Sequence, residues 1–273
     1  MATLQEHIEL LEEELWRRGN LTFLLRDYQV PLYKALKGAI TDESVLKYVL
    51  NCARRFGKST VLLIIAFEFA IQNDNSLIKF VAPTGKQIRE IVDELLRPLL
   101  ITCPKKLKPK WNGMDSFYKF PNGSKIKLAG TDKGHAESLR GGASHLSMVD
   151  EAGFCDDLSY IIKSILMPTT LTTGGTILLA STPPKTPDHD FADITHDCKE
   201  RGSYQEFDIY KNTSLTEHKI KLYAEESGGF DSTDFKREYL CIASESLVTV
   251  RDPNGNIKTL TIRELNNELS SNI

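Results

Sequence analysis

Apolar residues along the chain form short continuous runs that alternate with segments of helical spacing. The runs lie at residues 45–52, 77–84, 145–152 and 176–182, and each ends in polar residues. The first two runs are followed by segments with helical periodicity, at residues 59–72 and 85–100. Buried parallel strands have continuous apolar sequences, and the loops at their carboxyl ends commonly carry chemistry. The pattern therefore predicts an α/β fold with a mainly parallel sheet flanked by helices.

The two ends of the chain depart from this pattern. Ile8, Leu11, Leu15 and Trp16 stand at helical spacing among five glutamates and predict an amphipathic N-terminal helix within residues 1–20. We expect this helix to pack against its own domain, and docking on a partner is the alternative. Residues 246–265 contain two alternating β runs around a Pro-Asn-Gly-Asn turn, which predicts a hairpin outside the α/β core.

Composition narrows the class of protein. The chain of 273 residues is 41% hydrophobic and 26% charged, as in ordinary globular proteins. Its longest apolar run, residues 61–71, is interrupted by Glu68 and is shorter than the ~20 residues of a membrane span. The acidic N-terminus does not resemble a signal peptide, so we expect an intracellular protein without a membrane partner. Five cysteines without CxxC spacing argue against a disulfide framework or a zinc site.

Charge gives only a local indication of nucleic-acid binding. The net charge of −3 and the pI of about 6.1 provide no general attraction to nucleic acid, so any DNA contact must come from a local patch or from outside this chain. The stretch from Lys105 to Lys110, followed by Trp111, contains four lysines suited to phosphate contacts. A solvated loop is the alternative interpretation of this stretch.

Residues 52–60, Cys-Ala-Arg-Arg-Phe-Gly-Lys-Ser-Thr, lie between a predicted strand and a predicted helix. In that position backbone N–H groups and the helix N-terminus can hold phosphate oxygens. Gly57 permits close approach of the nucleotide, Lys58 would reach the β and γ phosphates, and Ser59 would bind Mg²⁺. We interpret the segment, with Thr60, as the ATP-binding loop of a P-loop NTPase core, although Cys52 replaces the usual opening glycine.

Two further features supply candidate catalytic residues. Asp150 and Glu151 end an apolar run, where Asp150 would hold Mg²⁺ and Glu151 would orient and deprotonate the attacking water. A helix-capping acidic pair is the alternative. Arg54 could neutralise charge that develops on the γ phosphate, whereas a solvated loop arginine is the alternative and fits Arg55 better.

Five motifs, taken in order, resemble the large terminase subunit, the DNA-packaging motor of tailed bacteriophages, over roughly residues 20–240. The motifs are RDYQ at 26–29, CARRFGKST at 52–60, VAPTGKQIREI at 81–91, SLRGGASHLSMVDEAGF at 138–154 and LLASTPP at 178–184. The resemblance implies that Gln29 reads the adenine and that Arg54 is the arginine this family carries in its phosphate loop. It also implies that Ser181 and Thr182 couple loss of the γ phosphate to movement of DNA.

The resemblance implies a function for the whole protein. That function is ATP hydrolysis, with Mg²⁺, that drives double-stranded DNA into a preformed capsid through a homo-oligomeric ring of subunits. The implied partners are the portal and the small terminase subunit, in the cytoplasm of an infected bacterium. The nuclease half of such proteins has no counterpart after Cys241. A helicase-like or other nucleic-acid-dependent ATPase is the alternative, and a degenerate, non-enzymatic domain is a third possibility.

The segment that begins at Cys241 resembles the opening block of an intein. Cys241 precedes the acidic-hydroxyl pair Glu245-Ser246, where aspartate is more usual, and a β run that leads to an Ile-Arg-Glu-Leu segment. The resemblance implies that Cys241 attacks the carbonyl of Leu240 and that residues 241–273 are the N-terminal fragment of a split intein. Residues 1–240 would then be the ATPase domain, and the partner would be a complementary intein fragment fused to the nuclease half. A buried structural cysteine before a truncation is the alternative.

Overall fold

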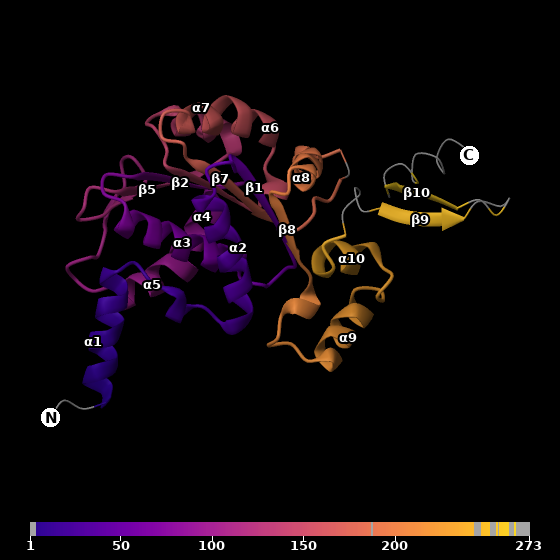
Figure 1. Ribbon diagram of the computed structural model, residues 1–273, viewed down its shortest axis with the longest axis horizontal. Coiled ribbons are helices and arrows are strands. Elements are labelled where there is room, and N and C mark those ends of the chain that lie inside the picture. Colours follow the sequence, from indigo (N-terminus) through magenta and orange to yellow (C-terminus); the bar gives the residue numbers. More distant parts are fainter. Residues whose placement is uncertain are drawn as a thin grey trace.

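The structure is a computed structural model that describes residues 4–186, 188–242, 247–251, 255, 257–261 and 265. An eight-stranded sheet with helices on both faces forms its centre (Figure 1). The strand order is β3-β4-β5-β2-β6-β7-β1-β8, and only the pairs β3–β4 and β4–β5 are antiparallel. The strands are β1 (Lys47–Cys52), β2 (Leu77–Ala82), β3 (Lys110–Asn112), β4 (Phe117–Lys119), β5 (Lys125–Gly130), β6 (Leu146–Asp150), β7 (Thr176–Ser181) and β8 (Tyr204–Phe207). The predicted α/β fold with a mainly parallel sheet is confirmed.

Helices precede, connect and follow these strands, and they cover both faces of the sheet. They are α1 (Leu4–Arg17), α2 (Val30–Thr41), α3 (Lys58–Gln72), α4 (Gly85–Ile91), α5 (Arg97–Thr102), α6 (Leu158–Tyr160), α7 (Met167–Thr170), α8 (Asp190–Glu200), α9 (Glu217–Glu226) and α10 (Thr233–Tyr239). Segments of π-helix join α4 to α5 and α6 to α7. Within the described part of the chain, no helix is both long and apolar enough to cross a membrane.

Successive residues of each central strand point into two different cores. Leu50 of β1 lies in a core with α2, α3, α9 and α10, whereas its neighbour Val49 lies in a core with α6 and α8. The alternation follows from the two-residue period of a strand. Because both faces are covered, the central strands have no polar face, which explains their continuous apolar runs. The apolar run at residues 61–71 is most of α3, a core helix whose side chains are mostly buried.

Helix α1 differs from our expectation. Trp16, in its last turn, is buried and contacts Phe67 edge-to-face, with ring centroids 6.3 Å apart. Ile8 and Leu11, however, are exposed, and Figure 1 shows α1 projecting from the body of the molecule. The expectation that this helix packs against its own domain therefore holds only at its last turn, because the apolar side chains before it extend beyond the surface that the domain offers.

The predicted hairpin is present. Strands β9 (Leu247–Arg251) and β10 (Ile257–Thr261) pair antiparallel and form a two-stranded sheet of their own. Glu245 and Ser246 lie outside the described residues. Four strands of the main sheet were not anticipated, namely β3, β4, β5 and β8, and β3 begins at the end of the lysine stretch.

Candidate functional site

The loop between β1 and α3 has the backbone shape of a phosphate-binding loop. Arg55 and Gly57 both adopt left-handed conformations, with φ of 61° and 87°. Such residues turn successive N–H groups toward one concave side, where they can hold an anion. A Cβ on Gly57 would lie 2.0 Å from Nε2 of Gln29, so both the conformation and the space require glycine here. Helix α3 begins at the next residue and directs its N-terminus at the same concavity.

Lys58 and Ser59 connect this loop to the acidic pair at the end of β6. The Lys58 ammonium lies 3.6 Å from Oε1 of Glu151 and donates to the Cys52 carbonyl at 3.4 Å. The Ser59 hydroxyl donates to Oδ2 of Asp150 at 2.5 Å. Burial is the largest single influence on the pKa of Lys58 and lowers it, but the neighbouring groups Glu151, Cys52 and Asp150 together raise it more, so the net shift of this pKa is upward. The lysine therefore stays charged in the site.

The acidic pair has an unusual geometry. Asp150 is the last residue of β6 and is 1% exposed. Its burial, and then the charge of Glu151, raise the pKa of Asp150 to about 6. Glu151 is left-handed, with φ of 50°, a conformation that costs a non-glycine residue roughly 1–2 kcal/mol and that is typical of functional sites. Its Oε2 atom is shielded from solvent and has no hydrogen-bond partner among the described residues.

A cavity of about 380 Å³ connects the loop and the acidic pair. Its walls include Lys58, Ser59, Thr60, Asp150 and Glu151, together with both loop arginines. The opposite wall comes from α4 and the π-helical segment after it, through Gln87, Glu90, Ile91 and Glu94. Sequence reasoning missed this wall, although positions three and four apart on a helix share one face. The pattern in GKQIREIVDE could have identified it.

Arg54 is bound by the end of α10. Its guanidinium lies 3.2 Å from Oε2 of Glu238, and its backbone N–H donates to the Glu238 carbonyl at 2.8 Å. Cys241 follows closely, since its carbonyl accepts from Nδ2 of Asn51 at 3.2 Å and its thiol donates to the Phe207 carbonyl at 3.4 Å. The segment after α10 therefore lies against the base of the phosphate loop, a contact that the sequence did not indicate.

The thiol of Cys241 is not activated in this conformation. Its side chain belongs to the hydrophobic core, and burial raises the pKa of the thiol far above its ordinary value. The backbone at Cys241 is left-handed, with φ of 58°, which is uncommon for a non-glycine residue. This residue thus combines a protected thiol with a strained backbone.

The remaining predicted residues lie beside the cavity. Gln29 is buried, accepts from the Arg26 N–H at 3.0 Å and packs over Gly57. Ser181 ends β7, which lies between β1 and β6, and its hydroxyl accepts from the Gly153 N–H at 2.9 Å. Thr182 follows it and is buried. Ser181 and the Thr182 carbonyl therefore lie against Gly153, in the segment after the acidic pair.

Comparison with known proteins agrees with this geometry. The family described as "Terminase large subunit, T4likevirus-type, N-terminal" matches residues 49–243. None of the curated proteins matches the chain by sequence.

Among solved structures, the large terminase of the thermophilic bacteriophage D6E superimposes with a TM-score of 0.61 at 14% identity, over 78% of this chain and 52% of the other. The ATPase domain of the Thermus phage P74-26 large terminase has a TM-score of 0.60 at 15% identity, over 77% of this chain and 96% of the other. The HK97 bacteriophage large terminase has a TM-score of 0.59 at 14% identity, over 80% of this chain and 51% of the other. These likenesses show the fold, and the chain spans about half the length of the D6E and HK97 proteins. Because the family match extends over more than half of the chain, the protein belongs to the T4likevirus-type terminase large subunit N-terminal family.

Proposed function

We propose that this chain is the ATP-hydrolysing domain of a DNA-packaging motor. The observation that carries the proposal is the pairing of Ser59 with Asp150 and of Lys58 with Glu151 across one cavity beside a left-handed phosphate loop. Family membership agrees with it. The D6E large terminase has been solved with ADP and with ATP-γ-S, which supports a nucleotide in the corresponding site here.

The residues present fit a magnesium ion. Asp150 is a buried carboxylate that points at the Ser59 hydroxyl, and both are oxygen donors of the kind that Mg²⁺ prefers. Ser59 and Asp150 would hold the ion. When bound, Mg²⁺ would neutralise negative charge on the β and γ phosphates.

The chain's own groups account for the hydrolytic step. The phosphate loop and Lys58 bind the β and γ phosphates and orient them. Glu151, whose Oε2 atom has no partner among the described residues, accepts the proton of the attacking water. The water oxygen bonds to the γ phosphorus as the bond from that phosphorus to the β–γ bridging oxygen breaks. Arg54, released from Glu238, stabilises the charge that develops on the γ phosphoryl group.

The remaining roles follow from the position of each residue. The Gln29 side chain packs against Gly57. Contact with the adenine would be a second role for its amide. Thr60 lines the nucleotide cavity next to Ser59. Ser181 and Thr182 lie beside the segment after Glu151, so a change at the γ phosphate would reach β7 through Gly153. We assign these two residues to coupling.

The wider function is that of a packaging motor. The chain would act in a homo-oligomeric ring that moves double-stranded DNA into a capsid, together with a portal and a small terminase subunit. This work would take place in the cytoplasm of an infected bacterium and transiently at the procapsid portal. The alternative is a helicase-like or other nucleic-acid-dependent ATPase with the same nucleotide site. DNA-stimulated ATP turnover that also requires procapsids would separate the motor from the helicase.

Glu151→Gln tests the assignment of the base. This variant should bind ATP normally and lose at least ~100-fold in turnover, because general-base catalysis contributes that much or more. Steady-state phosphate release and ATP binding by titration calorimetry measure the two effects. Glu43→Gln is the matched control, since Glu43 is an exposed glutamate that does not line this cavity and should leave turnover unchanged. Full turnover by the Glu151 variant would refute the assignment.

We also propose that residues 241–273 are the N-terminal fragment of a split intein that joins this chain to a nuclease half. In the first step the Cys241 sulfur bonds to the Leu240 carbonyl carbon, the peptide C–N bond breaks, and Cys241 gains a free amine that takes the proton. The resemblance of the sequence supports this proposal, and so does the uncommon backbone at Cys241. Because the thiol is buried, residues 241–242 must leave the core before the step can occur.

The test is a mixing experiment with the complementary half, which would carry the remaining intein and the nuclease. Intact-mass analysis should show a ligated product without residues 241–273, and Cys241→Ala should prevent its formation. Cys198→Ala is the control, because Cys198 is another buried cysteine, in the core on the opposite face of the sheet. Ligation by the Cys241 variant, or no ligation by the unaltered chain, would refute the splicing proposal and leave the ATPase proposal intact.

A further inference from the structure

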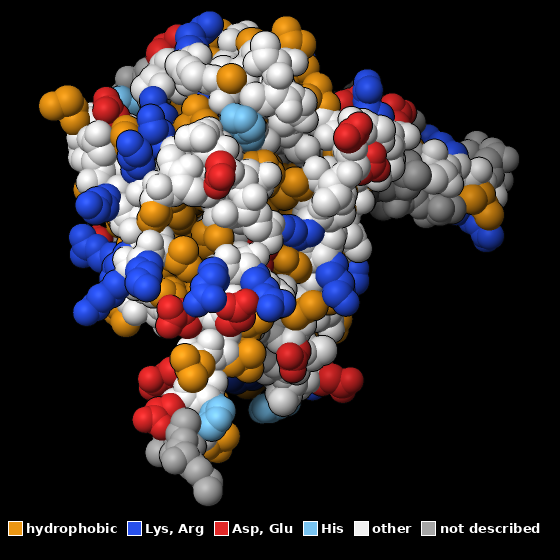
Figure 2. Space-filling view, turned by 60° about the vertical axis from the view of Figure 1, so that its left-hand side comes forward, with side chains coloured by type: hydrophobic (Ala, Val, Ile, Leu, Met, Phe, Trp, Pro, Cys, Tyr) orange, Lys and Arg blue, Asp and Glu red, His pale blue; other side chains and the backbone are white. Residues whose placement is uncertain are grey.

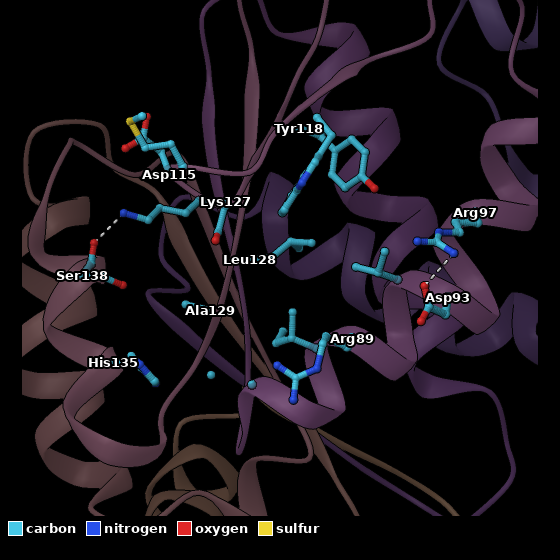
Figure 3. A pocket seen from close by; sticks show the side chains of 17 residues that line it. Arg89, Asp93, Arg97, Asp115, Tyr118, Lys127, Leu128, Ala129, His135 and Ser138 are labelled. Atoms are coloured by element: carbon cyan, nitrogen blue, oxygen red, sulfur yellow. Dashed lines mark hydrogen bonds and ion pairs between the residues drawn. The ribbon is translucent and has the colours of Figure 1, made fainter.

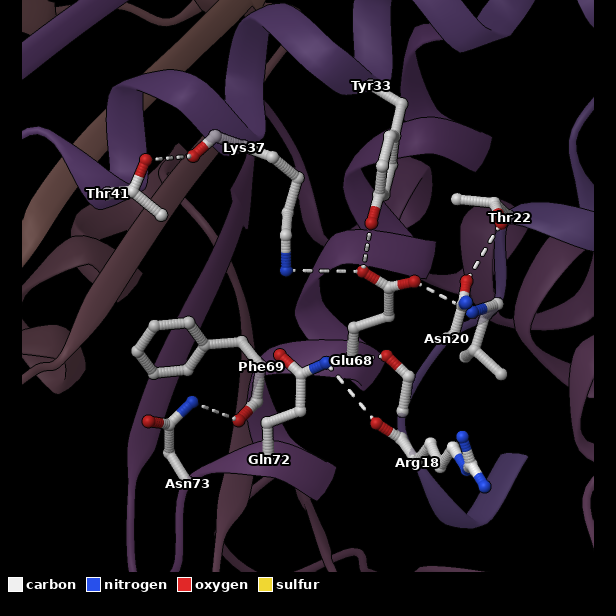
Figure 4. A network of polar contacts seen from close by, with 12 residues as sticks. Arg18, Asn20, Thr22, Tyr33, Lys37, Thr41, Glu68, Phe69, Gln72 and Asn73 are labelled. Atoms are coloured by element: carbon white, nitrogen blue, oxygen red, sulfur yellow. Dashed lines mark hydrogen bonds and ion pairs between the residues drawn. The ribbon is translucent and has the colours of Figure 1, made fainter. Parts of the chain in front are cut away.

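The base of α1 is fixed to α3 by buried polar contacts (Figure 4). Glu68 of α3 is fully buried and accepts from the Leu21 N–H and the Tyr33 hydroxyl, each at 2.7 Å. Gln72, one turn later, donates to the Gly19 carbonyl at 2.7 Å. Together with the buried Trp16, these contacts fix the chain where it leaves α1. The projecting part of α1 is therefore an arm with a rigid attachment.

The projecting part of α1 carries an apolar stripe that nothing in the described chain covers. Leu4, Ile8 and Leu11 follow one another at spacings of four and three residues, and their exposed fractions are 79%, 42% and 60%. Residues at this spacing share one helix face. Five glutamates surround the stripe, and Figure 2 shows acidic and hydrophobic side chains together on the projecting helix. A helix with an acidic and apolar surface needs a basic and apolar partner.

The same protein presents such a surface around β3 and the segment after α4. Three exposed lysines lie between α5 and β3, and a fourth begins β3. We call these lysines and the exposed apolar residues near them in the sequence the basic strip. Its members are Lys105, Lys106, Lys108, Lys110, Ile101, Trp111 and Met114. Figure 2 shows Lys and Arg side chains gathered on the body of the molecule on the side of the projecting helix.

A cavity of about 830 Å³ opens next to the basic strip (Figure 3). Its apolar lining includes Val92, Leu128 and Trp111. Arg89 lies at its edge without a hydrogen-bond or ion-pair partner in the described part of the chain, whereas Arg97 is paired with Asp93 at 3.1 Å. The cavity thus offers an apolar floor and a free cation to a ligand with leucine side chains and carboxylates.

We propose that α1 of one copy docks on the basic strip and this cavity of a second copy. A helix of 14 residues is ~21 Å long, and its stripe of leucine and isoleucine matches an apolar floor bordered by cations. The donor and acceptor surfaces differ, so each copy has one arm to give and one site to receive. The family match begins at residue 49, so the arm is a feature of this chain outside the matched segment. The inference does not depend on the nucleotide site.

Sedimentation velocity of the full chain, at low and raised ionic strength, tests the proposal. The unaltered chain should self-associate, and salt should weaken the association because opposite charges meet at the contact. Ile8→Asp with Leu11→Asp should raise the dissociation constant at least ~10-fold. Leu222→Asp is the matched control, because Leu222 is also an exposed helical leucine, 46% exposed on α9, and it should change nothing.

Charge-reversal variants distinguish self-association through α1 and the basic strip from DNA binding by the same lysines. Glu9→Lys with Glu12→Lys should prevent self-association, and so should Lys108→Glu with Lys110→Glu. A mixture of the two variants should associate again, because each supplies the complement of the other. A monomeric unaltered chain, failure of the mixture, or loss of DNA binding without loss of association in the lysine variant would overturn the proposal. A chain that associates through α1 yet hydrolyses no ATP would refute the proposed function only.

Discussion

At the scale of single residues, the nucleotide site depends on backbone conformations that side chains disfavour. Gly57 has φ of 87° and faces Gln29, which leaves no space for a Cβ. We expect Gly57→Ala to abolish ATP binding and to lower the free energy of unfolding by ~1–2 kcal/mol from the backbone alone. Gly38→Ala is the control, since nothing lies within 4 Å of a Cβ there and α2 should gain ~0.5–1 kcal/mol. Calorimetric titration and urea unfolding measure both effects, and normal ATP binding by Gly57→Ala would contradict the expectation.

Another residue outside the site makes stability depend on pH. Lys79 of β2 is fully buried and donates to the carbonyls of Leu139 and Gly142 at 2.7 and 3.2 Å. Burial, and then the nearby charge of Lys127, lower the pKa of Lys79 to about 8. Between this pKa and its ordinary value of ~10.4 the unfolded chain binds more protons, so stability rises with pH in that window.

Lys79→Met should remove this pH dependence. The unaltered chain should gain up to ~1.4 kcal/mol of unfolding free energy per pH unit from Lys79 between pH 8 and 10. The variant lacks that contribution and loses ~1–3 kcal/mol at pH 7 from the two unpartnered carbonyls. Urea unfolding across this range, with the exposed Lys105→Met as control, measures the difference in slope. Equal slopes in the variant and the unaltered chain would exclude Lys79 as the cause.

At the scale of elements, Glu68 joins three helical segments. It accepts from Leu21 and Tyr33, and it lies 3.3 Å from the Lys37 ammonium. Glu68→Gln keeps the shape but loses the charge that faces Lys37, so we expect a loss of ~1–3 kcal/mol in the free energy of unfolding. Guanidinium unfolding measures it, and the exposed Glu90→Gln should change stability by less than ~0.5 kcal/mol. An unchanged midpoint for Glu68→Gln would show that solvent replaces the lost contacts.

The strands that the sequence predicted are those whose residues are apolar because they are buried on both faces of the sheet. Both faces are covered at β1, β2, β6 and β7, so their apolar runs are continuous and can be recognised in the sequence. Strands β3 and β4 have three residues each and lie at one end of the sheet, and β8 reads Tyr-Gln-Glu-Phe. Such segments pair through backbone hydrogen bonds, which impose no clear pattern of apolar and polar residues on the sequence.

The candidate site was predictable to the same extent. Lys58 and Ser59 begin the helix after β1, and Asp150 and Glu151 stand at the end of β6, so local order identifies all four. Glu238 contacts Arg54 from 184 residues away, so only tertiary structure reveals it. The pattern of α1 showed an apolar face, but the sequence could not tell whether the domain or a partner covers it.

At the scale of the whole molecule, the segment after α10 is part of the support of the phosphate loop. Glu238 holds Arg54 by main chain and side chain, and Cys241 contacts Asn51 and Phe207 from within the core. Residues 241 and 242 therefore contact the domain that we propose for residues 1–240, since the Ile242 N–H also donates to the Lys236 carbonyl at 3.1 Å.

Two truncations test how far the segment after α10 supports the phosphate loop. A chain that ends at residue 242 should match the full chain in thermal stability and ATP affinity, because every contact described above remains. A chain that ends at residue 237 loses the buried Cys241 and both contacts of Glu238, so its free energy of unfolding should fall by ~2–4 kcal/mol. Its ATP affinity should fall as well, since Arg54 and the loop lose their support. If both truncated chains bind ATP equally well, the phosphate loop keeps its shape without the end of α10. In that case the nucleotide state of the loop is not transmitted through Glu238 to the segment after this domain.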